Sequence, residues 1–370
     1  MALADLVKIS NYYGCKEDVV LAGGGNTSYK DKDNLYIKAS GTTLATITDS
    51  GFVKMNRQKL NDIMTKKYSS DFQSRETEVL HDLMNAREQT ELSKRPSVET
   101  TLHNLFPQHY VVHTHPAMVN GLTCSKEGEH YAKEIFGNSA VWIEVTMPGY
   151  VLAKEVEEKL NCYKRDNCKT ANILLLENHG LFVAADSTDE IKRLMDYVFE
   201  KIKENISHYP NFGTIETDAD IDYISGKIAN TISDRTCKVI HLNNIQIKAL
   251  TENKQAFADV NYAFTPDHMV YYKHTPLFLD NISDIDLSVK TYKETFGFTP
   301  KIIAVAGVGA FAVGNDEKDA QTAKALFLDA VKISVYAKSF GGGRFMPDWL
   351  VNYINNWEAE TYRKGVGENK

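Results

Sequence analysis

The sequence has few cysteines, and none of them forms a metal-binding motif. The five are Cys15, Cys124, Cys162, Cys168 and Cys237. Their number is odd, their spacing is irregular and no Cys-x-x-Cys pair occurs, which disfavours both a disulfide framework and a zinc site built from thiolates. We therefore expect a reducing, cytoplasmic location.

Long apolar runs and long basic runs are also missing. No apolar stretch is long enough to span a bilayer, and the first residues lack the basic and apolar segments of a signal peptide. The net charge is −7, which disfavours nucleic acid and an anionic membrane as main partners. With 43% hydrophobic and 25% charged residues, the 370-residue chain is typical of a globular protein with room for two domains.

The sequence does contain histidines near predicted strand ends. The β-branched and aromatic stretch His109–Pro116 predicts a strand that ends in His113-Thr114-His115. Because side chains alternate along a strand, His113 and His115 point to one face and provide half of a metal site. Taken alone, this pair is explained equally well by two exposed histidines at a strand end.

A third histidine strengthens the metal hypothesis. His179 lies in Asn178-His179-Gly180, which closes an apolar run that predicts a buried strand. Three neutral imidazoles with one open position are typical of a catalytic zinc site, whereas structural zinc sites are closed. Imidazole also suits other divalent transition metals, so the residues do not fix the metal.

Two polar turns are candidates for binding an anionic group. The first is the glycine-rich stretch 23–25, which follows a strand expected at 19–22 and leads into Asn26-Thr27-Ser28. Glycines let a backbone approach a ligand closely, and Asn26 and Ser28 offer hydrogen bonds. The second is the turn at Ser40-Gly41, after a strand expected from residue 34. Plain turns between strands are the alternative interpretation of both.

Helix signals surround the remaining candidate residues. Pro96 followed by helix-forming residues predicts a helix start, with Glu99 in the first turn, where the helix dipole favours a carboxylate. That electrostatic role alone would account for Glu99. Ser187 with Glu190 forms a capping box at the start of a helix over 187–206.

A linker predicted at 208–219 divides the chain into domains at 1–208 and 218–370. The second part echoes the first, because residues 302–320 repeat the pattern of 173–191. The echo aligns Gly309 with Gly180, Phe311 with Phe182 and Val308 with His179. We therefore expect a smaller, related domain that has lost a metal ligand.

Other motifs of the second part have two interpretations each. Gly307-Val308-Gly309 resembles the start of a dinucleotide-binding loop, but Ala312 replaces the third glycine and the repeat explains the first two. Asp267, His268 and Lys273 either add polar groups to a site or form a satisfied turn. A helix is expected from Trp349 to Tyr362.

These motifs together resemble class II aldolases of the aldolase/adducin family. The resemblance covers residues 20–200 and is carried by a set of motifs in the family's order: Gly25-Asn26-Thr27-Ser28, Ser40-Gly41, Pro96-Ser97-Val98-Glu99, His113-Thr114-His115-Pro116 and Glu177-Asn178-His179-Gly180. The second part resembles the aldolase half of bifunctional rhamnulose-1-phosphate aldolase/alcohol dehydrogenases. That likeness rests on Pro266-Asp267-His268, Gly307-Val308-Gly309 and the segment 357–362.

The resemblance implies an α/β fold, an α/β/α sandwich around a largely antiparallel sheet, with a second, smaller related α/β domain. It implies zinc bound by the three histidines and Glu99 as the acid/base. It also implies a phosphate pocket lined by Asn26, Ser28, Ser40, Gly41 and Ser97. Val98 stands where fuculose-phosphate aldolases have a second serine, which leaves an unphosphorylated substrate open.

Such aldolases also take a tyrosine from a neighbouring subunit as proton donor. Tyr131 lies at a comparable distance after His115, so the resemblance implies this role for it and a homo-oligomer. The implied reaction is cleavage of a ketose 1-phosphate, such as rhamnulose 1-phosphate, to dihydroxyacetone phosphate and a short aldehyde. As the acid/base, Glu99 is expected to have a raised pKa in a site from which water is excluded. A sugar-phosphate epimerase or decarboxylase on the same metal site, and a non-catalytic adducin-like interaction protein, stay open as alternatives.

Overall fold

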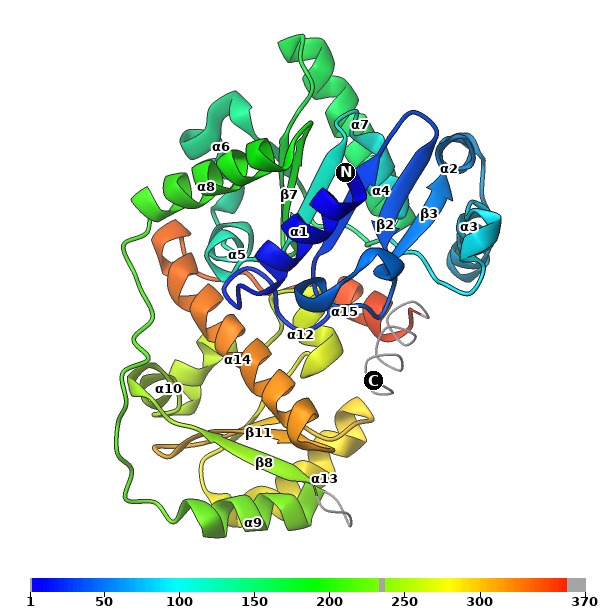
Figure 1. Ribbon diagram of the computed structural model, residues 1–370. Coiled ribbons are helices and arrows are strands. Elements are labelled where there is room, and N and C mark those ends of the chain that lie inside the picture. Colours follow the sequence, from blue (N-terminus) through cyan, green and yellow to red (C-terminus); the bar gives the residue numbers. More distant parts are fainter. Residues whose placement is uncertain (1, 233–236, 358–370) are drawn as a thin grey trace. The chain divides into compact units, whose positions relative to one another are not determined.

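The computed structural model describes residues 2–232 and 237–357 (Figure 1). The chain divides into two compact units. Unit 1 holds the residues up to 123, residues 128–205 and the end of the described chain from Asn356; unit 2 holds residues 124–127 and 206–355. The domain bounds 1–208 and 218–370 stay a prediction. Among the described residues, no helix is both long enough and apolar enough to cross a membrane.

Unit 1 contains a seven-stranded sheet in the order β3-β2-β1-β4-β7-β6-β5. Its strands are β1 (Asn26–Lys30), β2 (Asn34–Lys38), β3 (Phe52–Asn56), β4 (Tyr110–Thr114), β5 (Val141–Ile143), β6 (Ile173–Leu176) and β7 (Gly180–Ala185). Only β5 and β6 pair in parallel, and the other neighbours are antiparallel. The expected largely antiparallel sheet is confirmed.

Helices cover both faces of this sheet (Figure 1). They are α1 (Ala2–Gly14), α2 (Arg57–Thr65), α3 (Phe72–Asn85), α4 (Thr100–Leu105), α5 (Ala117–Thr123), α6 (Gly128–Phe136), α7 (Tyr150–Asn167) and α8 (Thr188–Glu204). Leu102 of α4 and Leu152 of α7 share one core with Phe182 of β7, whereas α1 and α8 lie on the opposite face. Ser187 caps α8 as predicted, because its side chain accepts the Glu190 amide. The α/β/α layering is therefore as expected.

Two predicted elements near the site are wrong. Residues 19–22 do not form a strand, because the amides of Val19 and Val20 both donate to the carbonyl of Lys16 in a turn. The strand begins only at Asn26. Helix α4 begins at Thr100 rather than at Pro96, so Glu99 is its N-cap, with φ −89 and ψ 8. Glu99 therefore stands before the helix and not within its first turn.

Unit 2 has a four-stranded sheet in the order β8-β11-β10-β9. Its strands are β8 (Lys238–Leu242), β9 (Leu277–Leu279), β10 (Ile302–Val305) and β11 (Gly309–Gly314). Its helices are α9 (Ile221–Ile232), α10 (Ile245–Leu250), α11 (Lys254–Phe257), α12 (Pro266–Tyr271), α13 (Ile285–Phe296), α14 (Glu317–Ala337) and α15 (Asp348–Asn355). The helix expected to reach Tyr362 ends at Asn355, and residues 358–362 of that prediction lie outside the described residues.

The unit 2 sheet repeats four neighbouring strands of the unit 1 sheet. The order β8-β11-β10-β9 corresponds to β4-β7-β6-β5, and the last two strands are parallel in both sheets. His241 lies opposite Phe311 as His113 lies opposite Phe182. The hydrogen bonds of the turns also correspond. The Asn178 amide donates to the Thr123 carbonyl, just as the Gly307 amide donates to the Thr251 carbonyl. The Glu177 amide donates to the Ile143 carbonyl, just as the Ala306 amide donates to the Leu279 carbonyl. The likeness is therefore one of strand register as well as order.

The repeat settles the interpretation of Gly307-Val308-Gly309. Gly307 and Val308 lie in the turn between β10 and β11, Gly309 begins β11, and the two strands pair with each other in antiparallel fashion. A dinucleotide-binding loop instead leads from a strand into a helix. The dinucleotide interpretation is therefore excluded, and the positive φ of 71 at Gly307 is explained by the tight turn.

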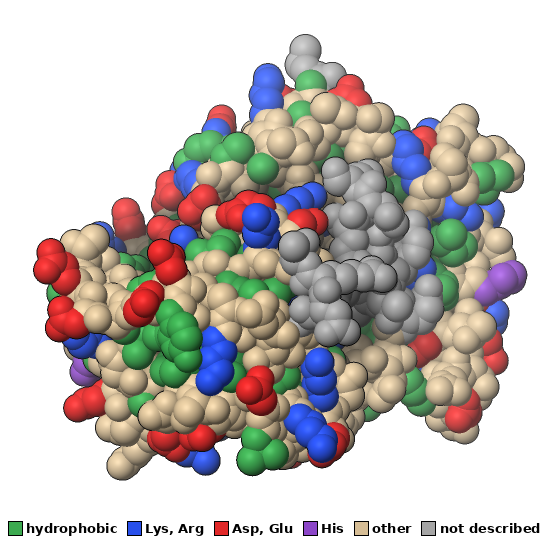
Figure 2. Space-filling view, turned by 90° about the horizontal axis from the view of Figure 1, so that it is seen from below, with side chains coloured by type: hydrophobic (Ala, Val, Ile, Leu, Met, Phe, Trp, Pro, Cys, Tyr) green, Lys and Arg blue, Asp and Glu red, His purple; other side chains and the backbone are tan. Residues whose placement is uncertain are grey.

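The surface charge is mixed. On the face shown in Figure 2, Lys and Arg side chains of the described residues are scattered among Asp and Glu side chains. Neither sign of charge forms a continuous patch on that face. This distribution accords with the modest net charge of −7.

Candidate metal centre

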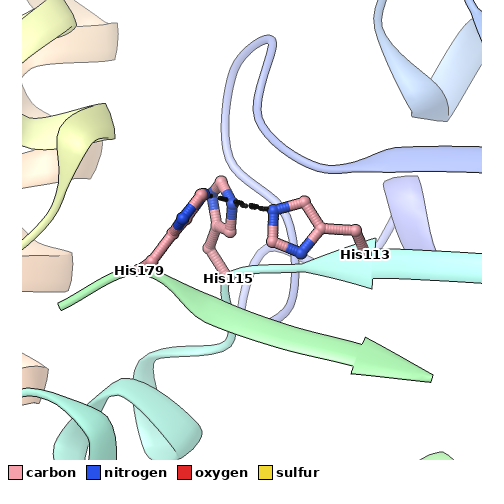
Figure 3. Close-up of side chains that lie close together, drawn as sticks. All are labelled: His113, His115 and His179. Atoms are coloured by element: carbon pink, nitrogen blue, oxygen red, sulfur yellow. Dashed lines mark hydrogen bonds between the residues drawn. The ribbon is translucent and has the colours of Figure 1, made fainter. Parts of the chain in front are cut away.

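The three predicted ligands converge in unit 1 (Figure 3). His113 lies on β4, His115 follows the end of that strand, and His179 precedes β7. The Nε2 atom of His113 lies 2.9 Å from Nε2 of His115 and 3.3 Å from Nε2 of His179. Nitrogens bound at about 2.0–2.1 Å to one tetrahedral zinc ion lie roughly 3.3 Å apart. The spacing and the donor type therefore fit a single ion.

The pairing of β4 with β7 brings the ligands together. Thr114 lies opposite Leu181, which puts His115 beside Gly180. A Cβ atom on Gly180 would lie 2.6 Å from the Thr114 carbonyl oxygen and 2.7 Å from Cδ2 of His115. The close approach of the two strands at this point therefore requires glycine. Asn178, at φ 53, makes the tight turn that presents His179.

Hydrogen bonding and burial prepare His113 as a ligand. Its Nδ1 atom lies 3.0 Å from the Leu181 carbonyl oxygen, and because a carbonyl only accepts, Nδ1 carries the proton. Nε2 is thereby left with a lone pair directed at the other two histidines. Burial lowers the pKa of His113, although the facing Glu99 carboxylate opposes this, and metals bind the neutral form of the ring.

Glu99 faces the ligand atoms. Its Oε1 lies 3.3 Å from His113 Nε2 and 3.5 Å from His179 Nε2, and its side chain is 12% exposed. Burial raises the pKa of the Glu99 carboxyl, but the positive charge and hydrogen bonding of the facing His113 and His179 rings, when these are protonated, outweigh burial and hold this pKa well below its usual value. The expected raised pKa is therefore wrong. A divalent cation at the histidines would keep the carboxylate ionised for the same reason.

Asn26 and Ser97 adjoin the carboxylate. Asn26 lies opposite His113 in the β1–β4 ladder, and its Nδ2 lies 3.5 Å from Glu99 Oε2. The same amide group donates to the Ser97 hydroxyl, whose oxygen also accepts the Glu99 amide at 3.2 Å. Two of the predicted pocket residues thus lie directly beside the candidate acid/base.

The turn at Ser40-Gly41 runs along the segment that carries Ser97. The Ser40 amide donates to the Arg95 carbonyl at 2.8 Å, and the Ser97 amide donates to the Lys38 carbonyl at 3.3 Å. Gly41 adopts φ 81, which a residue with a side chain rarely tolerates. The structure therefore brings Ser40, Gly41 and Ser97 together.

Ser28 and Tyr131 contact other residues. Ser28 is fully buried, and its hydroxyl is 2.8 Å from Nδ1 of His103. Tyr131 lies on α6, where its ring is 5.5 Å from that of His130. None of the other predicted site residues comes from this helix.

Lys38 was missed by the sequence reasoning. It is 6% exposed, and its ammonium group donates to the carbonyls of Gly23 and Gly25 at 2.9 and 3.0 Å. Lys38 thereby fixes the glycine turn that leads into Asn26 and brings a positive charge to that turn. The sequence feature that could have identified Lys38 is its position at the end of a predicted strand, directly before Ala39-Ser40-Gly41.

The polar motif of α12 is a satisfied core turn of unit 2. Nδ1 of His268 accepts the Phe264 amide at 3.2 Å, and Nε2 lies 3.2 Å from a carboxylate oxygen of Asp329. His268 is fully buried and Asp267 nearly so. The ammonium group of Lys273 lies over the Phe298 ring at 4.8 Å. Of the two interpretations of this motif, the contacts of His268 favour the satisfied turn.

Comparison with known proteins places the chain in a family. The family model described as the class II aldolase and adducin N-terminal domain matches residues 4–204. The chain belongs to the class II aldolase/adducin family. The predicted resemblance is thereby confirmed, and the matched range contains every residue of the candidate metal centre.

Several relatives extend the comparison. The chain is 24% identical to the uncharacterized oxidoreductase YuxG of Bacillus subtilis (strain 168) over 417 residues, which cover 97% of this chain and 58% of that protein. It therefore spans little more than half the length of this relative. The N-terminal class II aldolase domain of a conserved Thermoplasma acidophilum protein is 28% identical, with a TM-score of 0.46, over 54% of this chain and 91% of that one. An L-fuculose-1-phosphate aldolase from Thermus thermophilus is 16% identical, with a TM-score of 0.36, over 55% and 92%.

Proposed function

We propose that this protein is a metal-dependent aldolase that reversibly cleaves a ketose 1-phosphate, such as rhamnulose 1-phosphate, to dihydroxyacetone phosphate and a short aldehyde. The observation that carries the proposal is the convergence of three imidazole Nε2 atoms and the Glu99 carboxylate on one point. Membership in the class II aldolase/adducin family supports it. A purely adducin-like interaction role would not require this group of residues.

His113, His115 and His179 would hold the metal, which we propose is zinc. A divalent ion there would polarise the substrate carbonyl and stabilise the negative charge that carbon–carbon cleavage leaves on the ketone fragment. During cleavage, the hydroxyl that becomes the aldehyde loses a proton and the carbon of the ketone fragment gains one. Glu99 would carry the proton at that carbon: its carboxyl group would donate the proton during cleavage, and its carboxylate would remove the same proton in the reverse, synthetic direction.

The proposed phosphate pocket consists of Asn26, Ser40, Gly41 and Ser97, with Lys38 as an added cation. The positive charge of the buried Lys38 ammonium group supports an anionic substrate. Val98 stands where fuculose-phosphate aldolases have a second serine, so the proposed pocket has one hydroxyl fewer. We leave Ser28 out of the pocket because its hydroxyl bonds His103. We propose that Tyr131 of a neighbouring subunit exchanges the proton of the substrate hydroxyl that becomes the aldehyde. This role requires a homo-oligomer, for which we propose a cytoplasmic location.

The test combines metal analysis with product analysis. The purified chain should contain about one zinc ion per chain, and a His113→Ala/His115→Ala variant should contain none. The zinc-loaded chain should release dihydroxyacetone phosphate from a ketose 1-phosphate, detected with a coupled dehydrogenase. A ketose product of unchanged carbon number would instead identify an epimerase. No metal after incubation with zinc, and no turnover, would refute the proposal and favour a binding role.

A further inference from the structure

The ring of His113 lies flat on the ring of Phe182. The ring centroids are 3.8 Å apart and the planes differ by only 13°. Phe182 lies opposite His113 in the β4–β7 ladder and is fully buried. The hydrogen bond from Nδ1 to Leu181 fixes one point of the imidazole, and the phenyl face fixes its plane. Together these two contacts determine where Nε2 points.

Phe182 is itself held on its other sides. Its ring stacks on Phe106 with centroids 6.1 Å apart and 14° between the planes, and it meets the edge of His103 at 5.3 Å. His103 is in turn tied by its Nδ1 atom to the hydroxyl of Ser28 at 2.8 Å. A side chain packed on three sides has little freedom to turn. Phe182 is therefore a rigid support for the imidazole.

Unit 2 contains the same pair without the rest of the centre. His241 and Phe311 occupy the positions of His113 and Phe182, while Asn243 and Val308 follow at the positions of His115 and His179. The second stack is looser, with centroids 4.8 Å apart and planes inclined at 29°. Here it is Nε2 of His241 that approaches a backbone carbonyl, that of Val308, at 3.4 Å. The stack of His113 on Phe182, which has two further histidines beside it, is thus tighter than the stack of His241 on Phe311. The two imidazoles also differ in which ring nitrogen lies near a backbone carbonyl.

We propose that Phe182 is a positioning residue, which aligns His113 so that its Nε2 atom faces the metal. The inference rests on the metal site of the proposed function and adds a residue that touches neither substrate nor metal. Outer contacts that orient a histidine ligand typically contribute a factor of about 10–100 to metal affinity. Phe182 would act by ring stacking in place of the usual hydrogen-bonded carboxylate.

The experiment compares Phe182→Leu with Phe311→Leu as a matched control. Both changes remove a buried phenyl ring that stacks on a histidine, from the same position of two corresponding sheets. Zinc affinity would be measured by competition with a chromophoric chelator, and ligand geometry by the visible spectrum of the cobalt-loaded protein. We expect Phe182→Leu to weaken zinc binding about tenfold and to change the cobalt spectrum, while Phe311→Leu leaves both unchanged. Thermal unfolding should show a loss of stability in both variants.

The outcomes separate the inference from the function on which it rests. Wild-type zinc affinity and an unchanged cobalt spectrum in Phe182→Leu would overturn the inference while leaving the metal site intact. Equal weakening by Phe311→Leu would overturn it too, because general destabilisation would then explain both results. If Phe182→Leu does not fold, Phe182→Met fills the space with a flexible side chain that has no flat face, and the same criteria apply. A wild-type chain that binds no metal would refute the proposed function and this inference together.

Discussion

A single methyl group at Gly180 should disrupt the metal centre. Gly180 begins β7, directly after His179, at the point where β7 approaches the end of β4 most closely. The Cβ atom of an alanine would lie 2.6 Å from the Thr114 carbonyl oxygen and 2.7 Å from Cδ2 of His115. The φ angle of Gly180 is not positive, so alanine meets no backbone strain. The effect of Gly180→Ala therefore isolates these two contacts.

The size of the effect of Gly180→Ala depends on whether the Thr114 carbonyl or the His115 ring can move. The Thr114 carbonyl belongs to a central strand that is paired on both sides, so relief must come from displacement of the strands or of the His115 ring. Overpacking of this kind typically costs about 1–3 kcal/mol of folding stability. Metal–ligand distances tolerate changes of only about 0.2 Å. We therefore expect both a loss of stability and at least a tenfold loss of zinc affinity, the range found when ligand orientation is disturbed.

Urea unfolding and chelator competition would measure the two effects. Gly226→Ala is the control, because Gly226 lies inside α9 and an added Cβ would meet no atom within 4 Å. This change should leave zinc affinity unaltered and raise stability by about 0.5–1 kcal/mol, since glycine is a poor helix former. Unaltered zinc binding and stability in Gly180→Ala would refute the argument that close strand approach shapes the centre.

Three further predictions concern chemistry, acidity and the repeat. Glu99→Gln should retain zinc by elemental analysis but lose most turnover; a variant at the wild-type rate would show that Glu99 is not the acid/base. Burial lowers the pKa values of His103 and His113, so the unfolded chain binds more protons than the folded chain below about pH 6.5. Thermal unfolding of the metal-free protein should therefore shift to lower temperature as the pH falls through that value, and a melting temperature that rises instead would contradict the assigned direction. Asn243→His combined with Val308→His should give the chain a second zinc equivalent, whereas an unchanged stoichiometry would show that the two strand ends are not equivalent.

The pair of His113 and His115 could be predicted from the sequence because its geometry is local. His113 and His115 share a face through strand alternation, and the turn signal at Asn178-His179-Gly180 put the third histidine at a strand end. The meeting of the two segments was a resemblance-based expectation, and the β4–β7 pairing now provides its physical reason.

The electrostatics and the orientation of polar side chains could not be predicted in the same way. The pKa of Glu99 depends on histidines that come from two other segments, so burial alone gave the wrong direction. Ser28 shares a strand face with Asn26, but only the packing of α4 reveals that His103 covers it. Lys38 was overlooked because its role depends on carbonyls of a turn many residues earlier in the chain.

The two corresponding sheets allow two matching stretches of sequence to be compared within one molecule. Features present in both copies, such as the glycine after the turn and the stacked phenylalanine, are compatible with the fold whether or not a metal is bound. His115 and His179 occur only in the first copy, so they are the residues that metal binding requires and the fold does not. Exchanging residues between matched positions therefore offers a way to separate folding constraints from catalytic ones without any second protein.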